Sequence, residues 1–255
     1  MYPYLLGDSY VVMLILGVIA AIVVAVLYMK FRIKLGSVEI IDICLCTIVA
    51  VIAGVIFAIL FENFYEWIQK GKVVWTWGMT FIGGLFGGVV GFLLMYYLFY
   101  VKRHQAITGY ILIGAPACIT IAHAIGRIGC FLEGCCYGKE TDSWIGIVFP
   151  YGMGAGVKRI PTQLIESIFL FILSAIFIYL IFKTKFKYTL PVYLMVYGVF
   201  RFIIEFYRDD NRGQLENFLS PSQIWCIVMF MAGIALIFLQ KLVIFKGKQF
   251  YEGKN

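Results

Sequence analysis

Long apolar stretches alternate with short polar ones along the whole chain. Seven stretches are each long enough to cross the roughly 30 Å hydrocarbon core of a bilayer as a helix. They cover about 10–29, 40–61, 75–101, 106–125, 162–182, 189–207 and 219–245. The segments between them are too short to separate folded domains. The pattern predicts an all-α, polytopic integral membrane protein, a bundle of about seven transmembrane helices that forms one domain over residues 1–255.

Composition supports this prediction and narrows the class of partner. Hydrophobic residues make up 62% of the chain and charged residues only 14%, whereas soluble domains are nearer half apolar and a quarter charged. The net charge of +7 could suggest nucleic acid, but the basic residues flank the apolar stretches. They are therefore topology signals and lipid headgroup contacts, and we expect no nucleic-acid partner.

The distribution of basic residues predicts the orientation in the membrane. The loops after the first, third, fifth and seventh stretches are basic. They carry Lys30, Arg32, Lys34, Lys102, Arg103, Lys183, Lys185, Lys187, Lys241, Lys246, Lys248 and Lys254. The other loops mix basic residues with most of the acids. The positive-inside rule then places the N-terminus outside the cell and the C-terminus in the cytoplasm.

A few charged side chains interrupt the apolar stretches. Tyr197, Arg201 and Glu205 follow one another at four-residue spacing, so they share one face of a helix, and Arg208 follows within the next turn. A charge inside a membrane is costly and marks a functional site by default. With the predicted orientation, these residues lie toward the outer leaflet together with His123, Arg127, Gln163, Glu166 and Gln223. We infer an outward-facing polar cavity in which arginines bind an anion.

Roles can be suggested for several of these side chains. Glu166 and Glu205 are the acids placed to neutralise two arginines inside the membrane. Arg127 lies between Gly126 and Gly129, which we expect to permit close backbone approach and the turn out of the helix. His123 precedes Arg127 by one turn and is either a packing residue or a catalyst. The alternative is that the arginines bind no ligand and only extend their side chains to the lipid headgroups at the membrane surface.

The third apolar stretch is rich in glycine. Gly83, Gly87 and Gly91 repeat every four residues, as do Gly84 and Gly88. Small residues at this spacing let helix backbones approach closely in lipid. Helix packing explains most of these glycines, and the alternative is a ligand that lies against the bare backbone.

Three of the seven cysteines cluster between the fourth and fifth stretches. Cys130, Cys135 and Cys136 could be structural residues, form a disulfide on an oxidising side of the membrane, act as reactive thiols or bind a metal. A zinc site needs a fourth ligand, and no second cysteine pair or nearby histidine supplies one. We therefore expect no metal and no cofactor.

Several motifs together resemble the prolipoprotein diacylglyceryl transferase family. The strongest are GRIGCFLEGCCYG (126–138), RIPTQLIE (159–166) and YGVFRFIIEFYR (197–208). The weaker ones are GGLFG (83–87) and SPSQ (220–223), with a possible match at Tyr10. They occur in the order and spacing of the family and cover most of the chain from the third stretch onward.

The resemblance implies a reaction, partners and a location. Such enzymes transfer the diacylglyceryl group of phosphatidylglycerol to the lipobox cysteine of a prolipoprotein signal peptide and release glycerol phosphate. They work among the lipids at the outer face of the bacterial cytoplasmic membrane. It implies catalytic roles for Arg127, Arg201, His123, Tyr197 and Glu205. Substrate-binding roles would fall to Tyr10, Gly83, Gly84, Gly126, Gly129, Cys130, Glu133, Gly138, Gln163, Glu166 and Arg208.

The chain also departs from the family pattern. Ile82 stands where the family usually has a histidine, Cys130 replaces an asparagine, Cys135 a glutamate, and Val55 a common arginine. Because isoleucine cannot carry a proton, His123, Glu205 or Tyr197 would have to act as the base. Two alternatives follow: a related phospholipid-dependent transferase with a different acceptor, and a non-enzymatic protein that binds or transports anionic lipid.

Overall fold

The fold was analysed in a computed structural model of the chain. It describes residues 8–71, 75–76, 80–100, 108–150, 155–209 and 219–246; of residues 69, 70, 81, 82, 221 and 240–246 only the backbone is described. The described helices are α1 (Ser9–Leu27), α2 (Ser37–Lys70), α3 (Phe81–Met95), α5 (Thr108–Glu133), α6 (Thr162–Lys183), α7 (Thr189–Glu205) and α8 (Pro221–Lys246). Two π-helical turns, η1 (Tyr28–Ile33) and η2 (Tyr96–Tyr100), continue α1 and α3.

The prediction of a helical membrane protein is confirmed. Within the described residues, six helices are long and apolar enough to cross a membrane, namely α1, α2, α3, α5, α6 and α8 with their π-helical extensions. Helix α7 has 17 residues, which at about 1.5 Å of rise per residue is near the shortest length that spans a bilayer core. The prediction that α7 also crosses stays a prediction, as does the orientation.

The structure differs from the sequence prediction in helix boundaries and in one added element. Helix α2 continues to Lys70, nine residues beyond the predicted end at 61, and α3 begins at Phe81 rather than at 75. Helix α5 continues to Glu133, eight residues beyond the predicted end at 125, because neither Gly126 nor Gly129 leaves the helical conformation. The chain turns out of the helix at Gly134, whose φ of 73° favours glycine. The added element is a small antiparallel ribbon, β1 (Ile147–Val148) and β2 (Lys158–Arg159), which an all-α prediction omits. The predicted loop between the third and fourth stretches, at about 102–105, lies outside the described residues.

Residues 29–108 form a smaller unit, built on the pair of α2 and α3. A Cβ atom at Gly83 would lie 2.6 Å from the Phe57 carbonyl oxygen, and one at Gly87 would overlap Phe57 Cβ. At Gly91 it would meet Ala53 Cβ at 2.6 Å. The glycine stripe thus lets the two helices pack with their backbones nearly touching, as the four-residue spacing predicts.

Residues 1–28 and 109–255 form a larger unit that contains α1, α5, α6, α7 and α8. Ser167 on α6 donates a hydrogen bond to the Ala124 carbonyl on α5, and Thr189 on α7 donates to the Ile113 carbonyl on α5. On α1, a Cβ atom at Gly17 would lie 2.8 Å from the Ala122 oxygen. Helix α5 is therefore bound on several sides, and one stripe of α6 is buried along its whole length.

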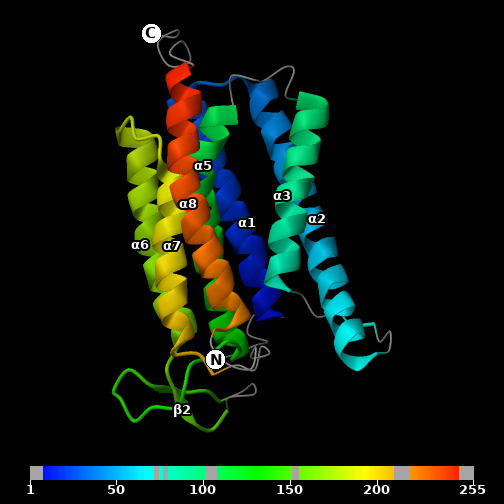
Figure 1. Cartoon of the computed structure of the whole chain (residues 1–255), viewed down its shortest axis with the longest axis vertical. Helices are drawn as coiled ribbons and strands as arrows, with labels where there is room; N and C mark the ends of the chain where they lie inside the picture. The colour runs from blue at the N-terminus through cyan, green and yellow to red at the C-terminus, as the bar shows by residue number, and fades with distance from the viewer. Residues whose placement is uncertain are drawn as a thin grey trace. The chain divides into compact units, whose positions relative to one another are not determined.

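The ends of four helices meet at one end of the larger unit (Figure 1). There α5 ends, α6 begins after Pro161, α7 ends, and α8 begins at Pro221. Proline suits a helix start because its missing N–H would be unsatisfied there anyway. The start of α8 is also fixed by Ser220 and Gln223, whose side chains each accept a hydrogen bond from the other residue's backbone N–H, at 3.2 and 3.0 Å. This is a capping box.

The β ribbon lies beside these helix ends (Figure 1). Gly138 donates its backbone N–H to the Ile160 carbonyl, and Lys139 donates to the Tyr207 carbonyl at the end of α7. Arg159 pairs with Glu140 at 2.9 Å and with Asp209 at 2.6 Å. These contacts attach the segment after α5 to the beginning of α6 and the end of α7.

The predicted topology can be tested at opposite ends of the larger unit. A cysteine at Trp144, which is 90% exposed in the β-ribbon segment, should react with a membrane-impermeant maleimide in intact cells. A cysteine at the exposed Lys185, between α6 and α7, should react only in inverted vesicles. Labelling is read as the increase over the unsubstituted protein, because the chain has its own thiols. The reverse pattern would contradict the predicted orientation.

Candidate anion-binding site

Glu166 is the centre of a buried polar cluster at the end of the larger unit where α5 and α7 end and α6 and α8 begin. Its side chain is 1% exposed, and its Oε2 atom lies 3.0 Å from Nε of Arg127. Tyr197 donates its hydroxyl to Oε1 at 2.8 Å. His123 Nε2 is 3.7 Å from the same oxygen. Three helices, α5, α6 and α7, therefore converge on one carboxylate.

A second carboxylate, Glu205, joins the ends of α7 and α8. Its Oε2 atom lies 2.7 Å from Nη1 of Arg201 and 3.8 Å from Nε of Arg208. Its Oε1 atom accepts the Ser220 hydroxyl at 3.0 Å. The capping serine of α8 thus also binds the counter-charge of Arg201, so the helix start and the ion pair depend on each other.

The two halves of the cluster act on one another. Arg201 interacts electrostatically with Glu166, as do Arg127 and His123. Tyr197 stacks on Tyr193 and meets the His123 ring edge-to-face, with centroids 5.7 and 5.4 Å apart. Both arginines therefore interact with the same carboxylate, Glu166. Because the cluster is largely shielded from water, these charge interactions are stronger than they would be in bulk water.

The arginine N–H groups are paired in charge but not fully hydrogen-bonded. Arg127 Nε and Arg201 Nη1 are both buried, and neither has an acceptor at good hydrogen-bond geometry despite the short distances to the carboxylates. A buried donor without an aligned acceptor costs about 1–3 kcal/mol. Guanidinium groups suit the oxygens of a phosphate, so these two side chains are the candidate anion ligands of the cluster.

Helical spacing explains why these side chains meet. Arg201 and Glu205 are one turn apart and pair directly along α7, and Tyr197 is one turn earlier on the same buried stripe. Glu166 lies on the second turn of α6, beside α5. The predicted pairing of two arginines with Glu166 and Glu205 is what the structure shows.

Comparison with known proteins identifies the family of the chain. A family model described as prolipoprotein diacylglyceryl transferase matches residues 7–239. The chain belongs to the prolipoprotein diacylglyceryl transferase family. The resemblance of the motifs is thereby confirmed over most of the sequence.

Several curated relatives have names that agree with the family. The chain is 35% identical over 203 residues to phosphatidylglycerol–prolipoprotein diacylglyceryl transferase 2 from Clostridium perfringens, covering 77% of this chain and 78% of the relative. It is 30% identical over 229 residues to the Clostridium tetani enzyme, with 89% and 90% covered. The Geobacter sulfurreducens enzyme is 33% identical over 202 residues, with 74% and 73% covered.

A layer of backbone contacts supports the cluster in this family member. Gln163 and Thr162, both buried in the first turn of α6, donate hydrogen bonds to the carbonyls of Cys135 and Cys136. Gly138 is packed so tightly that a Cβ atom would lie 2.6 Å from the Tyr207 oxygen. Gln163 and Gly138 therefore position the backbone around the site: Gln163 holds the segment after α5, and Gly138 lets that segment pack against the end of α7.

The remaining predicted residues lie at the periphery of the cluster or in the smaller unit. Gly129 lets α1 approach, because a Cβ atom there would meet Met13 Cβ at 3.0 Å and Tyr10 Cδ2 at 3.3 Å. Gly126 makes no comparably close contact, and Glu133 is exposed at the end of α5. Gly83 and Gly84 belong to the smaller unit, where Gly83 packs on α2. The side chain of Ile82 lies outside the described residues.

Two supporting residues were not predicted as part of the site. Thr162 fixes the loop after α5, and Ser220 binds Glu205. The signal for Ser220 was present, because a serine three residues before a glutamine, followed by an apolar run, is typical of a capping box. Nothing in the sequence indicated that the same hydroxyl reaches a carboxylate on another helix.

The cysteine segment lies next to the cluster. Arg127 Nη1 is 4.0 Å from the Cys130 sulfur, and no disulfide joins the three cysteines, all of which lie within the described residues. Hydrogen bonding to the neighbouring thiols of Cys130 and Cys136, together with burial, raises the pKa of the Cys135 thiol, which lies outside the helices. Cys135 is therefore protonated at neutral pH and is not a ready nucleophile.

The central ion pair can be tested by stability. Replacing Glu166 with glutamine leaves Arg127 as an unpaired buried charge, which costs about 3 kcal/mol or more. We expect a clear drop in the thermal unfolding midpoint of the detergent-solubilised protein. The double variant Arg127→Gln/Glu166→Gln should recover part of the loss, because it removes both charges. Equal midpoints for Glu166→Gln and the wild type would contradict this account.

Proposed function

We propose that this protein transfers the diacylglyceryl group of phosphatidylglycerol to the lipobox cysteine of prolipoproteins. The reaction takes place at the outer face of the bacterial cytoplasmic membrane. The names of its relatives support this activity, and the multi-pass helical architecture supports the location. The structural observation that supports the proposal is the pair of arginines at one buried cluster: Arg127, 12% exposed and paired with Glu166, and the buried Arg201, paired with Glu205.

The chemistry requires the stabilisation of growing negative charge. The acceptor sulfur forms a bond to the glycerol carbon of the diacylglyceryl group while the bond from that carbon to a phosphate oxygen breaks. A phosphodiester with one negative charge thereby becomes a phosphate monoester, and the acceptor thiol loses a proton. Arg127 and Arg201 would bind the phosphate oxygens and stabilise the additional charge on the leaving oxygen.

The same cluster has to supply the base. Glu205 already neutralises Arg201 and Arg208, and the Tyr197 hydroxyl donates a hydrogen bond to Glu166. His123 lies 3.7 Å from Glu166 and is the group best suited to take the thiol proton. Glu166 would then stabilise the resulting imidazolium. This arrangement would replace the family histidine whose position Ile82 occupies.

The first test is removal of Arg201. We expect Arg201→Ala to lower the transfer of labelled diacylglyceryl from phosphatidylglycerol to a lipobox peptide by about 100-fold or more, because a preorganised charge contact in the transition state is lost. Arg201→Lys should retain only part of the activity, since lysine cannot make the paired hydrogen bonds of a guanidinium. The assay uses purified protein in phosphatidylglycerol vesicles.

The controls separate charge from folding. Arg32→Ala removes an exposed arginine from η1 and should leave transfer unchanged. The Arg201→Ala variant must elute from size exclusion at the same volume as the wild type, which shows that it is folded. If it does not, the Arg201→Lys variant, which keeps the positive charge, is used for the comparison instead. Near-normal turnover of a folded Arg201→Ala variant would contradict the proposed role.

The second test concerns the proton. We expect His123→Gln to slow transfer by about 100-fold, the lower end of what general base catalysis contributes. Cys130→Ser should have the smaller effect, because its thiol contacts Arg127 only at 4.0 Å. A larger loss of activity in Cys130→Ser than in His123→Gln would indicate that the cysteine segment, and not His123, takes part in the proton transfer.

The acceptor can be tested in cells. A strain that lacks its own diacylglyceryl transferase should grow when this protein is expressed in its membrane. Failure with a well-expressed protein that still transfers diacylglyceryl in vitro would favour the related transferase with a different acceptor. Phosphatidylglycerol binding without any transfer would favour the non-enzymatic alternative.

A further inference from the structure

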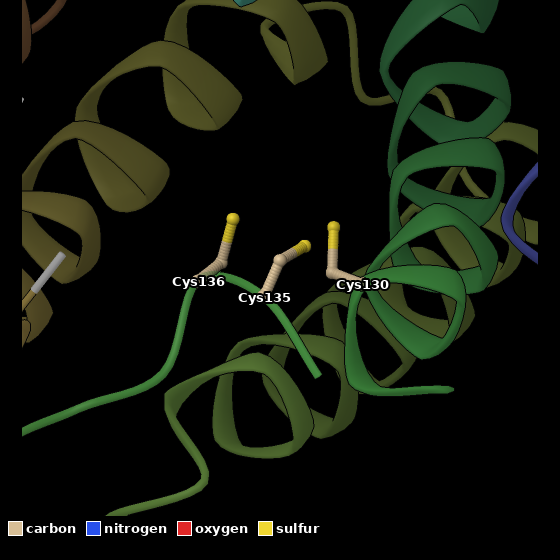
Figure 2. Close-up of side chains that lie close together, drawn as sticks. All are labelled: Cys130, Cys135 and Cys136. Carbon is tan, nitrogen blue, oxygen red and sulfur yellow. The ribbon is translucent and has the colours of Figure 1, made fainter. Parts of the chain in front are cut away.

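The three cysteines after the family's arginine motif converge on one point. The sulfur atoms of Cys130, Cys135 and Cys136 all lie within 4.8 Å of one another. Cys130 is on the last turns of α5, and the other two follow the turn at Gly134. Figure 2 shows the three side chains side by side, with their sulfur atoms on the same side of the backbone.

The conformation of the backbone between Cys130 and Cys136 brings the three thiols close together. Cys135 donates its N–H to the Cys130 carbonyl at 3.1 Å, and Gly134 donates to the Phe131 carbonyl at 3.2 Å, which closes the end of α5. Cys136 has a φ of 62°, a left-handed conformation that a non-glycine residue rarely adopts. Strained conformations of this kind cluster at functional sites. Here it accompanies two successive thiols that lie on one side.

The positions of the two loop cysteines are fixed from the other side. The carbonyls of Cys135 and Cys136 accept hydrogen bonds from Gln163 and Thr162, which are each 1% exposed. These donors sit on the first turn of α6, a rigid element. The backbone oxygens are therefore bound to α6, and the geometry of the three sulfurs does not depend on a free loop.

We propose that these cysteines form a binding site for one thiophilic metal ion, with three sulfur ligands and one open coordination position. Zinc and copper(I) are the ions that prefer such ligands. Three thiolates around a zinc ion at about 2.3 Å each have sulfur–sulfur separations of nearly 4 Å, within the limit observed here. Three protein ligands with an open fourth position are typical of zinc sites that bind water or a substrate.

Charge also favours the site. Binding of Zn²⁺ releases the three thiol protons to solvent and leaves a complex with one net negative charge. Arg127 Nη1 lies 4.0 Å from the Cys130 sulfur and supplies a compensating positive charge. Because Arg127 also pairs with Glu166, the metal would lie beside the anion-binding cluster.

This inference departs from the expectation of no metal. The sequence argument required a fourth protein ligand, which a structural zinc site needs but an open site does not. A disulfide within the cluster would use two thiols and leave the third unexplained. The inference does not depend on the transferase activity, because it rests on the thiol geometry and on the neighbouring charge of Arg127.

The test is metal binding by the full-length protein in detergent. After reduction with a phosphine that does not bind metal, equilibrium dialysis against Zn²⁺ should give one ion per chain. Replacing it with Co²⁺ should give a thiolate-to-cobalt charge-transfer band. X-ray absorption of the zinc form should show three sulfur neighbours at about 2.3 Å.

Single substitutions identify the ligands. Cys130→Ser, Cys135→Ser and Cys136→Ser should each weaken Zn²⁺ affinity by about 100-fold or more, since losing a direct ligand costs at least as much as losing an outer-shell partner. The matched control is Cys118→Ser on α5, which should bind zinc as the wild type does. Unchanged unfolding midpoints without metal would show that the variants remain folded.

Two results would overturn the proposal. One is zinc affinity in the reduced wild type no higher than in the triple serine variant. The other is a disulfide between two of these cysteines in protein purified without reductant in the presence of zinc. Either would assign the cluster to packing or to redox chemistry instead.

Discussion

The structure depends on the neutralisation of arginine inside a largely apolar helix bundle. A guanidinium group cannot lose its proton, so its burial must be compensated by a fixed negative charge. Glu166 compensates Arg127 from the next helix, and Glu205 compensates Arg201 from the same helix. Each carboxylate is then bound by a hydroxyl from a further residue, Tyr197 or Ser220. Four helices are therefore joined around two ion pairs.

This constraint also explains why the site lies at one end of the larger unit. A helix end offers backbone groups and capping side chains that are already polar, so charges can be added there at lower cost than in the middle of a span. The capping serine of α8 is bound to Glu205, and the first turn of α6 holds the loop after α5. The side chains that start the helices are thus the ones that position the site.

Much of this could be predicted because the relevant signals are local. Apolar length predicts membrane helices, four-residue spacing predicts the Tyr197, Arg201 and Glu205 stripe, and charge balance predicts that Glu166 has to meet an arginine. Glycine spacing likewise predicted that the third stretch packs closely on another helix; Gly83 and Gly87 confirm this and show that the partner is α2.

What the sequence could not predict depends on contacts between distant segments. The expected helix end at about 125, beside Gly126, was wrong, because a glycine within a helix and a glycine that ends one look alike in sequence. The correct end at Gly134 depends on hydrogen bonds closed by Cys135. The convergence of three thiols depends on the conformation of Cys136 and on side chains of α6. No spacing rule covers such an arrangement.

The central claim is that two carboxylate-neutralised arginines receive the phosphate of a lipid. Its most direct test is an experimental structure of the protein with bound phosphatidylglycerol. The account predicts the phosphate oxygens within hydrogen-bond distance of the Arg127 and Arg201 guanidinium groups, with Glu166 still buried between α5 and α7. A lipid phosphate bound elsewhere, with both arginines still facing only their carboxylates, would contradict it.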